Sequence, residues 1–272
     1  MTAFRFRCGA VLAAAWLAGG GFAARDCVAQ SLFVIPTDSP PSATVADNQP
    51  LRIALHVRDS VALAKVLGVK PPEAETGVLQ YVMSSYPVIQ GTVPRGWIEP
   101  TFVIDYREPS VVQLSVKFEE TLAHKSPPAT ATLNALIAFV GGAVQESHNR
   151  GFDIASEVAV HREGDCKEFA VLTVALARAA GIPARVVLGL ALLRFGTAYG
   201  AFGHAWAELQ VEGRWVVADA ALANRDTPVR YLPFGVLENE GMGYALEVAR
   251  LTPVWVQRVD VLGSASVEET FH

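Results

Sequence analysis

The sequence predicts an α+β protein, in which a smaller β-rich unit precedes a larger unit that combines helices with antiparallel strands. Three observations predict it. Hydrophobic residues alternate along short segments before residue 125, they recur at helical spacing after it, and two alternating segments joined by Glu212-Gly213 follow an apolar helix. The change of period near residue 125 divides the chain into residues 30–125 and residues 126–272.

Residues 1–29 have the features of a secretory signal. Two arginines precede a short apolar run from Cys8 to Ala18, and small residues fit cleavage before Gln30, with an earlier cut near Ala23 left open. The apolar run is shorter than the roughly 20 residues that cross a bilayer. We therefore expect a periplasmic or secreted protein, with no stable membrane insertion once the signal is removed.

Charge and cysteine content narrow the function classes. The formal net charge is −5, 18% of the residues are charged, and no basic stripe is present, which argues against nucleic acid as a partner. Removal of the signal would leave Cys166 as the single cysteine of an exported protein, where structural cysteines normally occur in pairs. This lone thiol therefore indicates a chemical role.

The first unit reads as short strands joined by loops. Leu51–Val57 and Thr101–Tyr106 alternate between apolar and polar residues, as half-buried strands do, and frequent prolines interrupt the region. It contains no catalytic motif. We expect it to serve as a scaffold or as a surface for substrate.

Helices are expected at the start of the second unit. After Ser126-Pro127-Pro128, apolar residues over 129–147 recur at helical spacing, and a second short helix is expected at Ala155–His161. Gln145 and Asn149 carry amides that could donate to an oxyanion, but each is better explained as a solvated helix residue.

A strongly apolar helix is expected to begin at Cys166 and to end near Ala180, before Gly181. Asp165 or Gly164 would cap it, and Glu168 is interpreted as a charge on the helix face. The free N–H groups and positive dipole end of a helix favour a thiolate and donate to a developing oxyanion. The alternative is that Cys166 is a small buried hydrophobic residue.

The two segments after this helix predict a hairpin that pairs a histidine with an aspartate. If Glu212-Gly213 is a two-residue turn, Trp206 pairs with Asp219, and His204 becomes the diagonal neighbour of Asp219 on one sheet face. A carboxylate there would fix the imidazole tautomer, so that the other ring nitrogen exchanges a proton with the thiol. A turn of another length would place Asp219 on the opposite face.

These segments resemble the transglutaminase-like superfamily, in particular its exported bacterial members, over about residues 125–260. The resemblance implies a papain-like α+β core with the cysteine helix packed on an antiparallel sheet, and it assigns the catalytic positions to Cys166, His204 and Asp219. It also implies that Trp206 and Trp215 pack within the sheet, with the alternative that Trp206, which shares the predicted face with His204, lines the cleft. Residues Tyr231–Leu251 would extend the core. The motifs that carry it are Gly164-Asp165-Cys166-Lys167-Glu168-Phe169-Ala170, Ala177–Val187, Gly203-His204-Ala205-Trp206-Ala207-Glu208 and Trp215–Ala220.

The function expected from these residues is cysteine-dependent acyl transfer or hydrolysis at amide or peptide carbonyls, through a thioester and with a protein or peptide as substrate. The alternative is a catalytically inactive module of the same fold that binds or assembles other proteins. Neither the histidines nor the cysteines have the spacing of a zinc site, and no calcium loop is present, so no metal or cofactor is expected. The sequence does not specify the oligomeric state.

Overall fold

A computed structural model gives the fold, in which Ser31–His272 form one compact unit. The expected signal at 1–29 and Asn149 lie outside the described residues, and the division of the chain at residue 125 stays a prediction. The structure describes residues 34–40, 45–46, 49–73, 76–83, 97–122, 129–147, 154–223, 228–244, 246 and 256–265.

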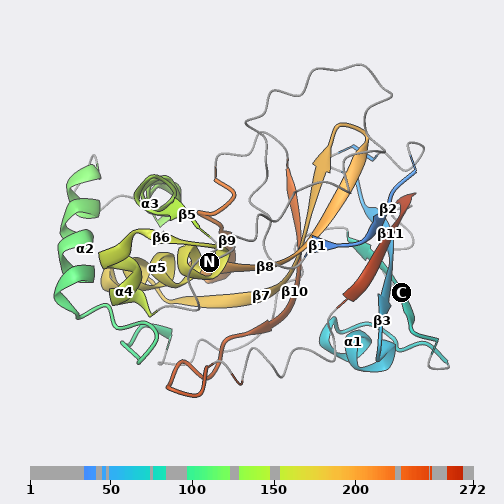
Figure 1. The fold of residues 1–272 in the computed structure, drawn as a ribbon, viewed down its shortest axis with the longest axis horizontal. Coiled ribbons are helices and arrows are strands. Elements are labelled where there is room, and N and C mark those ends of the chain that lie inside the picture. Colours follow the sequence, from blue (N-terminus) through green and yellow to red (C-terminus); the bar gives the residue numbers. More distant parts are fainter. Residues whose placement is uncertain are drawn as a thin grey trace, which may run out of the picture. The chain divides into compact units, whose positions relative to one another are not determined.

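Helix α5 forms the centre of the helical half of the protein. It spans Cys166–Ala179, and every residue from Glu168 to Arg178 is buried. Three helices surround it in Figure 1 and share its hydrophobic core. The expected helix at Ala155–His161 is confirmed, whereas the one expected over 129–147 ends at Ala143. The surrounding helices are α2 (Pro109–Thr121), α3 (Ala129–Ala143) and α4 (Ala155–His161).

An antiparallel sheet packs against α5 and extends beyond it. Its order is β1-β8-β7-β10, and β9 also pairs with β8, so that a long hairpin of β7 and β8 forms the middle of the sheet. Side chains from this hairpin, among them Val186 and Ala207, share the hydrophobic core with α5. The strands are β1 (Val34–Ile35), β7 (Ala184–Phe195), β8 (Ala198–Val211), β9 (Arg214–Ala218) and β10 (Val229–Val236).

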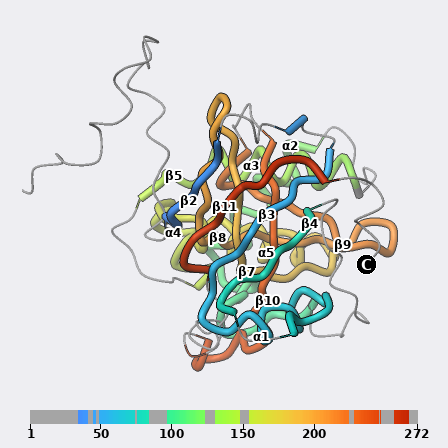
Figure 2. The backbone as a smooth tube through the Cα atoms, turned by 90° about the vertical axis from the view of Figure 1, so that its right-hand side faces the viewer, coloured from blue at the N-terminus to red at the C-terminus, as the bar shows by residue number. Residues whose placement is uncertain are grey.

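A second sheet joins the beginning of the chain to its end. Its order is β2-β11-β3-β4, and Figure 2 shows β11 running beside β3 although about two hundred residues separate them. Helix α1 (Ser60–Val66) flanks this sheet, and a second core fills the space between it and the far half of the β7–β8 hairpin. The strands are β2 (Thr37–Asp38), β3 (Leu51–Val57), β4 (Val78–Met83) and β11 (Val256–Ser264).

The structure confirms one of the two strands expected in the first unit and corrects the other. Leu51–Val57 is β3, but residues 101–106 form a turn. Its backbone pairs with other loops in place of a strand, since Val103 N donates to Glu240 O at 3.0 Å, Ala155 N donates to Val103 O at 2.9 Å, and the Thr101 hydroxyl accepts from Ile104 N at 3.0 Å. Val103 and Ile104 are both fully buried, so burial does not alternate along this segment.

The expected β-rich region also contains α2, which was not predicted. Pro109 was interpreted as an interruption of strands, but it occupies the first turn of α2, where the missing N–H of proline costs nothing. The short strands β5 (Gln145–Glu146) and β6 (Glu163–Gly164) follow α3 and precede α5. Among the described residues, no helix is long and apolar enough to cross a membrane.

Candidate active site

Cys166 is the first residue of α5, and a capping box fixes its place. Asp165 is the N-cap, Lys167 N donates to Asp165 Oδ1 at 3.0 Å, and Asp165 N donates to Glu168 Oε2 at 2.9 Å. These bonds use backbone donors that a helix start leaves free. The N–H of Cys166 has no acceptor among the residues that the structure describes, so it is available to an oxyanion beside the thiol.

Glu168 is not the helix-face charge that its position suggested. Its side chain is fully buried beneath the helix start, where it completes the capping box. Gly164 makes room for it, because a Cβ on Gly164 would lie 2.3 Å from the Glu168 Cβ. The local sequence Gly-Asp-Cys-Lys-Glu is therefore explained by the construction of this helix end.

A positive charge lies next to the thiol. The Lys167 ammonium forms an ion pair with the Asp165 carboxylate, and the Lys167 side chain is 24% exposed. Burial opposes the charge of Lys167, but the Asp165 hydrogen bond and the charges of Asp165, Cys166 and Glu168 raise its pKa. Burial likewise opposes ionisation of Asp165, yet hydrogen bonds and charge from Lys167 hold its pKa below the usual range. This pair therefore remains ionised near neutral pH.

The predicted hairpin and its register are confirmed. Val211 pairs with Arg214 across the two-residue turn, and Ala207 pairs with Ala218. Glu212 and Gly213 have φ values of 51° and 77°, which are typical of the type I′ turn that joins tightly twisted strands. The same register, continued by one residue, places Trp206 opposite Asp219 and makes His204 its diagonal neighbour.

The structure brings the three predicted site residues together. His204 Nε2 lies 2.8 Å from Asp219 Oδ2, and the Cys166 side chain is hydrogen-bonded to His204. Since Nε2 faces the carboxylate, Nδ1 is the ring nitrogen left for the thiol. The other Asp219 oxygen, Oδ1, accepts from Ala221 N at 3.1 Å and from Leu222 N at 3.3 Å.

The charge state of His204 follows from its neighbours. Complete burial favours the neutral ring, but the charge and hydrogen bond of Asp219, together with the hydrogen bond and charge of Cys166, outweigh burial and raise the pKa of His204 to about 10. At neutral pH the imidazole therefore carries a proton on both nitrogens. This is the protonation state that pairs with a thiolate and holds a proton ready for a leaving group.

Two aromatic residues pack against the imidazole, and Tyr231 was not predicted as part of the site. Trp206 lies beside the His204 ring with 6.1 Å between centroids, and Tyr231 lies on it with 6.3 Å between centroids. The Tyr231 hydroxyl donates to Asp219 Oδ2 at 2.8 Å. No motif marks Tyr231, because only the pairing of β10 with β7 brings it to the site.

Trp215 lies elsewhere in the sheet, as expected for a packing residue. Its ring covers the Arg185 guanidinium at 4.0 Å, and Arg185 Nε donates to Glu208 Oε2 at 2.7 Å in a buried ion pair. Gln145 begins β5, which pairs with β6 directly before Asp165, and its side chain is exposed. Within the described part of the chain, no group of three or more His, Cys, Asp or Glu side chains is placed to hold a metal ion.

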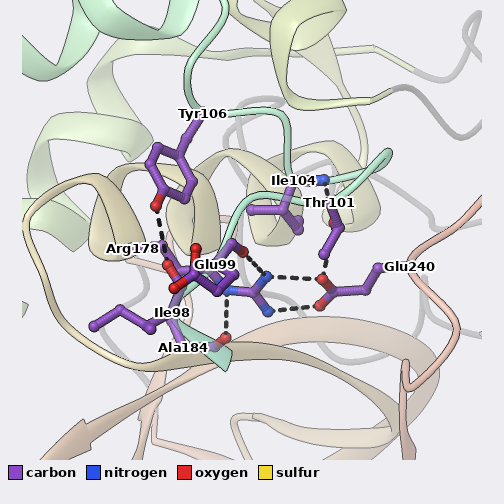
Figure 3. A network of polar contacts seen from close by, with 8 residues as sticks. All are labelled: Ile98, Glu99, Thr101, Ile104, Tyr106, Arg178, Ala184 and Glu240. Carbon is purple, nitrogen blue, oxygen red and sulfur yellow. Dashed lines mark hydrogen bonds and ion pairs between the residues drawn. The ribbon is translucent and has the colours of Figure 1, made fainter. Parts of the chain in front are cut away.

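The opposite end of α5 is tied down by a separate polar network (Figure 3). Arg178 forms a buried bidentate ion pair with Glu240, with N–O distances of 2.6 and 2.7 Å. Its Nε donates to Ala184 O at 2.9 Å, and its Nη1 donates to Glu99 O at 3.0 Å as well as to Glu240. A cavity of about 600 Å³, lined by Trp97 and Glu240 among others, lies at this end of the helix. It is therefore about 20 Å along α5 from the thiol.

Comparisons with known proteins agree with this core. Residues 117–220 match the family model of the transglutaminase-like superfamily. This segment includes all of α5 and the three residues of the site, and it ends directly after Asp219. Residues 117–220 therefore form a transglutaminase-like domain. The sequence has no match among curated proteins.

Several solved structures are similar to the chain. A candidate cysteine protease from Cytophaga hutchinsonii is 15% identical over 86% of this chain and 84% of its own, with a TM-score of 0.45. The periplasmic domain of TgpA from Pseudomonas aeruginosa is 28% identical over 42% of this chain and 43% of its own, with a TM-score of 0.33. A candidate protease from Parabacteroides distasonis is 15% identical over 70% of this chain and 41% of its own, with a TM-score of 0.33.

Proposed function

We propose that the protein is a cysteine-dependent acyl-transfer enzyme. It attacks amide or peptide carbonyls, breaks the C–N bond and forms a thioester, with hydrolysis of the thioester as its main outcome. Cys166 is the nucleophile, His204 the acid and base, and Asp219 the residue that orients His204. The observation that carries the proposal is the hydrogen-bonded chain from Cys166 through His204 to Asp219 at the start of a buried helix.

The first half of the reaction forms the thioester. The Cys166 thiolate attacks the carbonyl carbon, and the negative charge moves to the carbonyl oxygen, where the Cys166 N–H can donate to it. When the tetrahedral intermediate collapses, the C–N bond breaks and the leaving nitrogen takes the proton from His204 Nδ1. Ammonia or an amine departs, and the imidazole is left neutral.

The second half releases the acyl group. Water, or an amine in a transfer reaction, attacks the thioester carbonyl while His204 Nδ1 accepts its proton. The C–S bond breaks, and the thiolate and imidazolium are restored. Asp219 keeps its hydrogen bond to Nε2 throughout, so only Nδ1 exchanges protons.

The setting of this chemistry is proposed from the first residues of the chain. The signal-like segment at 1–29 supports export, and we therefore propose that the enzyme acts on peptide or protein substrates in the periplasm or outside the cell. The proposed roles require neither a metal nor a cofactor.

The pH dependence of Cys166 alkylation by iodoacetamide tests this proposal. The wild type is compared with His204→Ala, and His161→Ala serves as the matched control because His161 pairs with Glu157 on the exposed side of α4. In the wild type we expect rapid alkylation well below pH 8.5, the midpoint of an ordinary thiol. His204→Ala should lose this rapid alkylation at low pH, and His161→Ala should keep it. A thiol with an ordinary profile in both proteins would instead indicate an inactive module that binds or assembles proteins.

A substrate assay follows from the same variants. Release of ammonia or of a new amine from peptides that contain glutamine should require Cys166, and Cys166→Ser should abolish it while leaving the fold intact by circular dichroism. Detection of an acyl group on Cys166 by mass spectrometry would identify the thioester. Equal release by the wild type and by Cys166→Ser would refute the assignment of the nucleophile.

A further inference from the structure

One oxygen of Asp219 accepts two hydrogen bonds, one from His204 on β8 and one from Tyr231 on β10. His204 Nε2 and the Tyr231 hydroxyl both lie 2.8 Å from Asp219 Oδ2. Backbone N–H groups of Ala221 and Leu222 occupy Oδ1. A carboxylate offers about four lone-pair positions, so these four donors leave it no second orientation. The plane of the carboxylate is thereby fixed relative to the imidazole.

The Tyr231 ring restrains the imidazole as well. Its centroid lies 6.3 Å from that of His204, with an interplanar angle of 29°, and 5.1 Å from that of Trp206. Trp206 in turn is nearly parallel to His204, at 21°. The three rings form one packed group, so Trp206 and Tyr231 restrict the rotation of the imidazole.

We propose that Tyr231 is a positioning residue, whose hydroxyl holds Asp219 Oδ2 in line with His204 Nε2 and whose ring holds the plane of the imidazole. The proposal rests on the proposed function for its chemical meaning, because it assigns Tyr231 to the proton transfers of that site. Both the neutral and the charged imidazole donate from Nε2, so the Tyr231–Asp219 bond persists through the reaction. Proton exchange is thereby confined to Nδ1.

The hydroxyl also supports the charged imidazole. Asp219 is 8% exposed, so Tyr231 takes the place of a water molecule as a donor to its carboxylate. Without this donor, the carboxylate is held less firmly in line with His204 Nε2, and the imidazolium loses part of the contact that raises its pKa. Loss of the hydroxyl should therefore lower the pKa of His204.

Tyr231→Phe tests the proposal, because it removes the hydroxyl and keeps the ring. Tyr106→Phe is the matched control, since the Tyr106 hydroxyl also donates one hydrogen bond, to Ile98 O at 3.0 Å, in the network at the far end of α5. Two measurements are made on each folded protein. Both are made by NMR, and they are the pKa of His204 and the rate at which the His204 Nε2 proton exchanges with water.

In Tyr231→Phe we expect the pKa of His204 to fall by up to about one to two pH units, the range that one hydrogen bond to a charged group supports, and the Nε2 proton to exchange faster. Tyr106→Phe should change neither. An unchanged exchange rate in Tyr231→Phe, or an equal change in Tyr106→Phe, overturns the proposal.

The two measurements keep this proposal separate from the proposed function. If wild-type Cys166 alkylates as an ordinary thiol, the enzymatic proposal fails. Exchange of the His204 Nε2 proton still reports whether Tyr231 positions the pair, so faster exchange in Tyr231→Phe would then support positioning in an inactive fold. If the thiol is activated and the pKa of His204 in Tyr231→Phe equals that of the wild type, the positioning role is refuted.

Discussion

Gly189 is predicted to be the position in the sheet where one added methyl group has the largest effect. It pairs with His204 across β7 and β8, and β10 passes close to it on the other side. A Cβ at Gly189 would lie 2.2 Å from Leu232 O, 2.8 Å from the Trp206 ring and 2.9 Å from Pro233 Cα. Two of these atoms belong to the backbone, so no change of rotamer removes the overlap.

Gly189→Ala therefore requires β10 to separate from β7 by roughly 1 Å in a close-packed interior. Overpacking of this kind costs about 1–3 kcal/mol, and occasionally more. In a domain of this size, each kcal/mol shifts the melting temperature by about 2–4 °C. We expect thermal unfolding, followed by circular dichroism, to occur about 2–12 °C lower than in the wild type.

Gly142→Ala is the control for this prediction. Gly142 lies in α3, and a Cβ there would meet nothing within 4 Å. Alanine in a helix is favoured over glycine by up to about 1 kcal/mol, so Gly142→Ala should melt at or above the wild-type temperature. Equal melting temperatures for Gly189→Ala and the wild type would refute the reasoning, because they would mean that the strands separate at no cost.

Two further predictions concern charges. Arg178→Met should lower the free energy of unfolding in urea by about 3–5 kcal/mol, because it leaves the Glu240 carboxylate buried without this cation. Arg107→Met, the control, breaks an exposed pair with Glu99 and should lower it by less than about 1 kcal/mol. In a Cys166→Ala background, which removes titration of the thiol, the raised pKa of His204 means that the native state binds more protons than the unfolded state above about pH 6.5. The free energy of unfolding should then fall as pH rises from about 6.5 towards the raised pKa, by up to about 1.4 kcal/mol per pH unit. Adding His204→Gln to Cys166→Ala should flatten this dependence. A flat profile in Cys166→Ala alone would contradict the assignment of a charged imidazole.

Local rules were sufficient for the parts of the site that are close in sequence. Asp165 as N-cap and the start of α5 at Cys166 follow from capping chemistry, and the pairing of β8 with β9 follows from a turn of two residues. Because these rules operate over a few residues, they needed no knowledge of the rest of the fold. They brought His204 and Asp219 together correctly.

The sequence could not reveal contacts that depend on distant pairing. Tyr231 reaches Asp219 only because β10 pairs with β7, and Glu240 reaches Arg178 across 62 residues. Glu168 was misread because a buried carboxylate and an exposed one look alike in a helical pattern until the cap is resolved. At residues 101–106, backbone hydrogen bonds to Glu240 and Ala155 replaced those of a neighbouring strand.

The position of β11 has a consequence for how the chain acquires its structure. β11 lies between β2 and β3, so the second sheet lacks an interior strand until residues 256–264 are available. A chain that emerges from its amino end would expose the edge of β3 during nearly all of its synthesis or translocation, and closing so long a loop is slow. Removal of the last strand should therefore disturb the first strands of the protein, whereas the helical half could assemble before it.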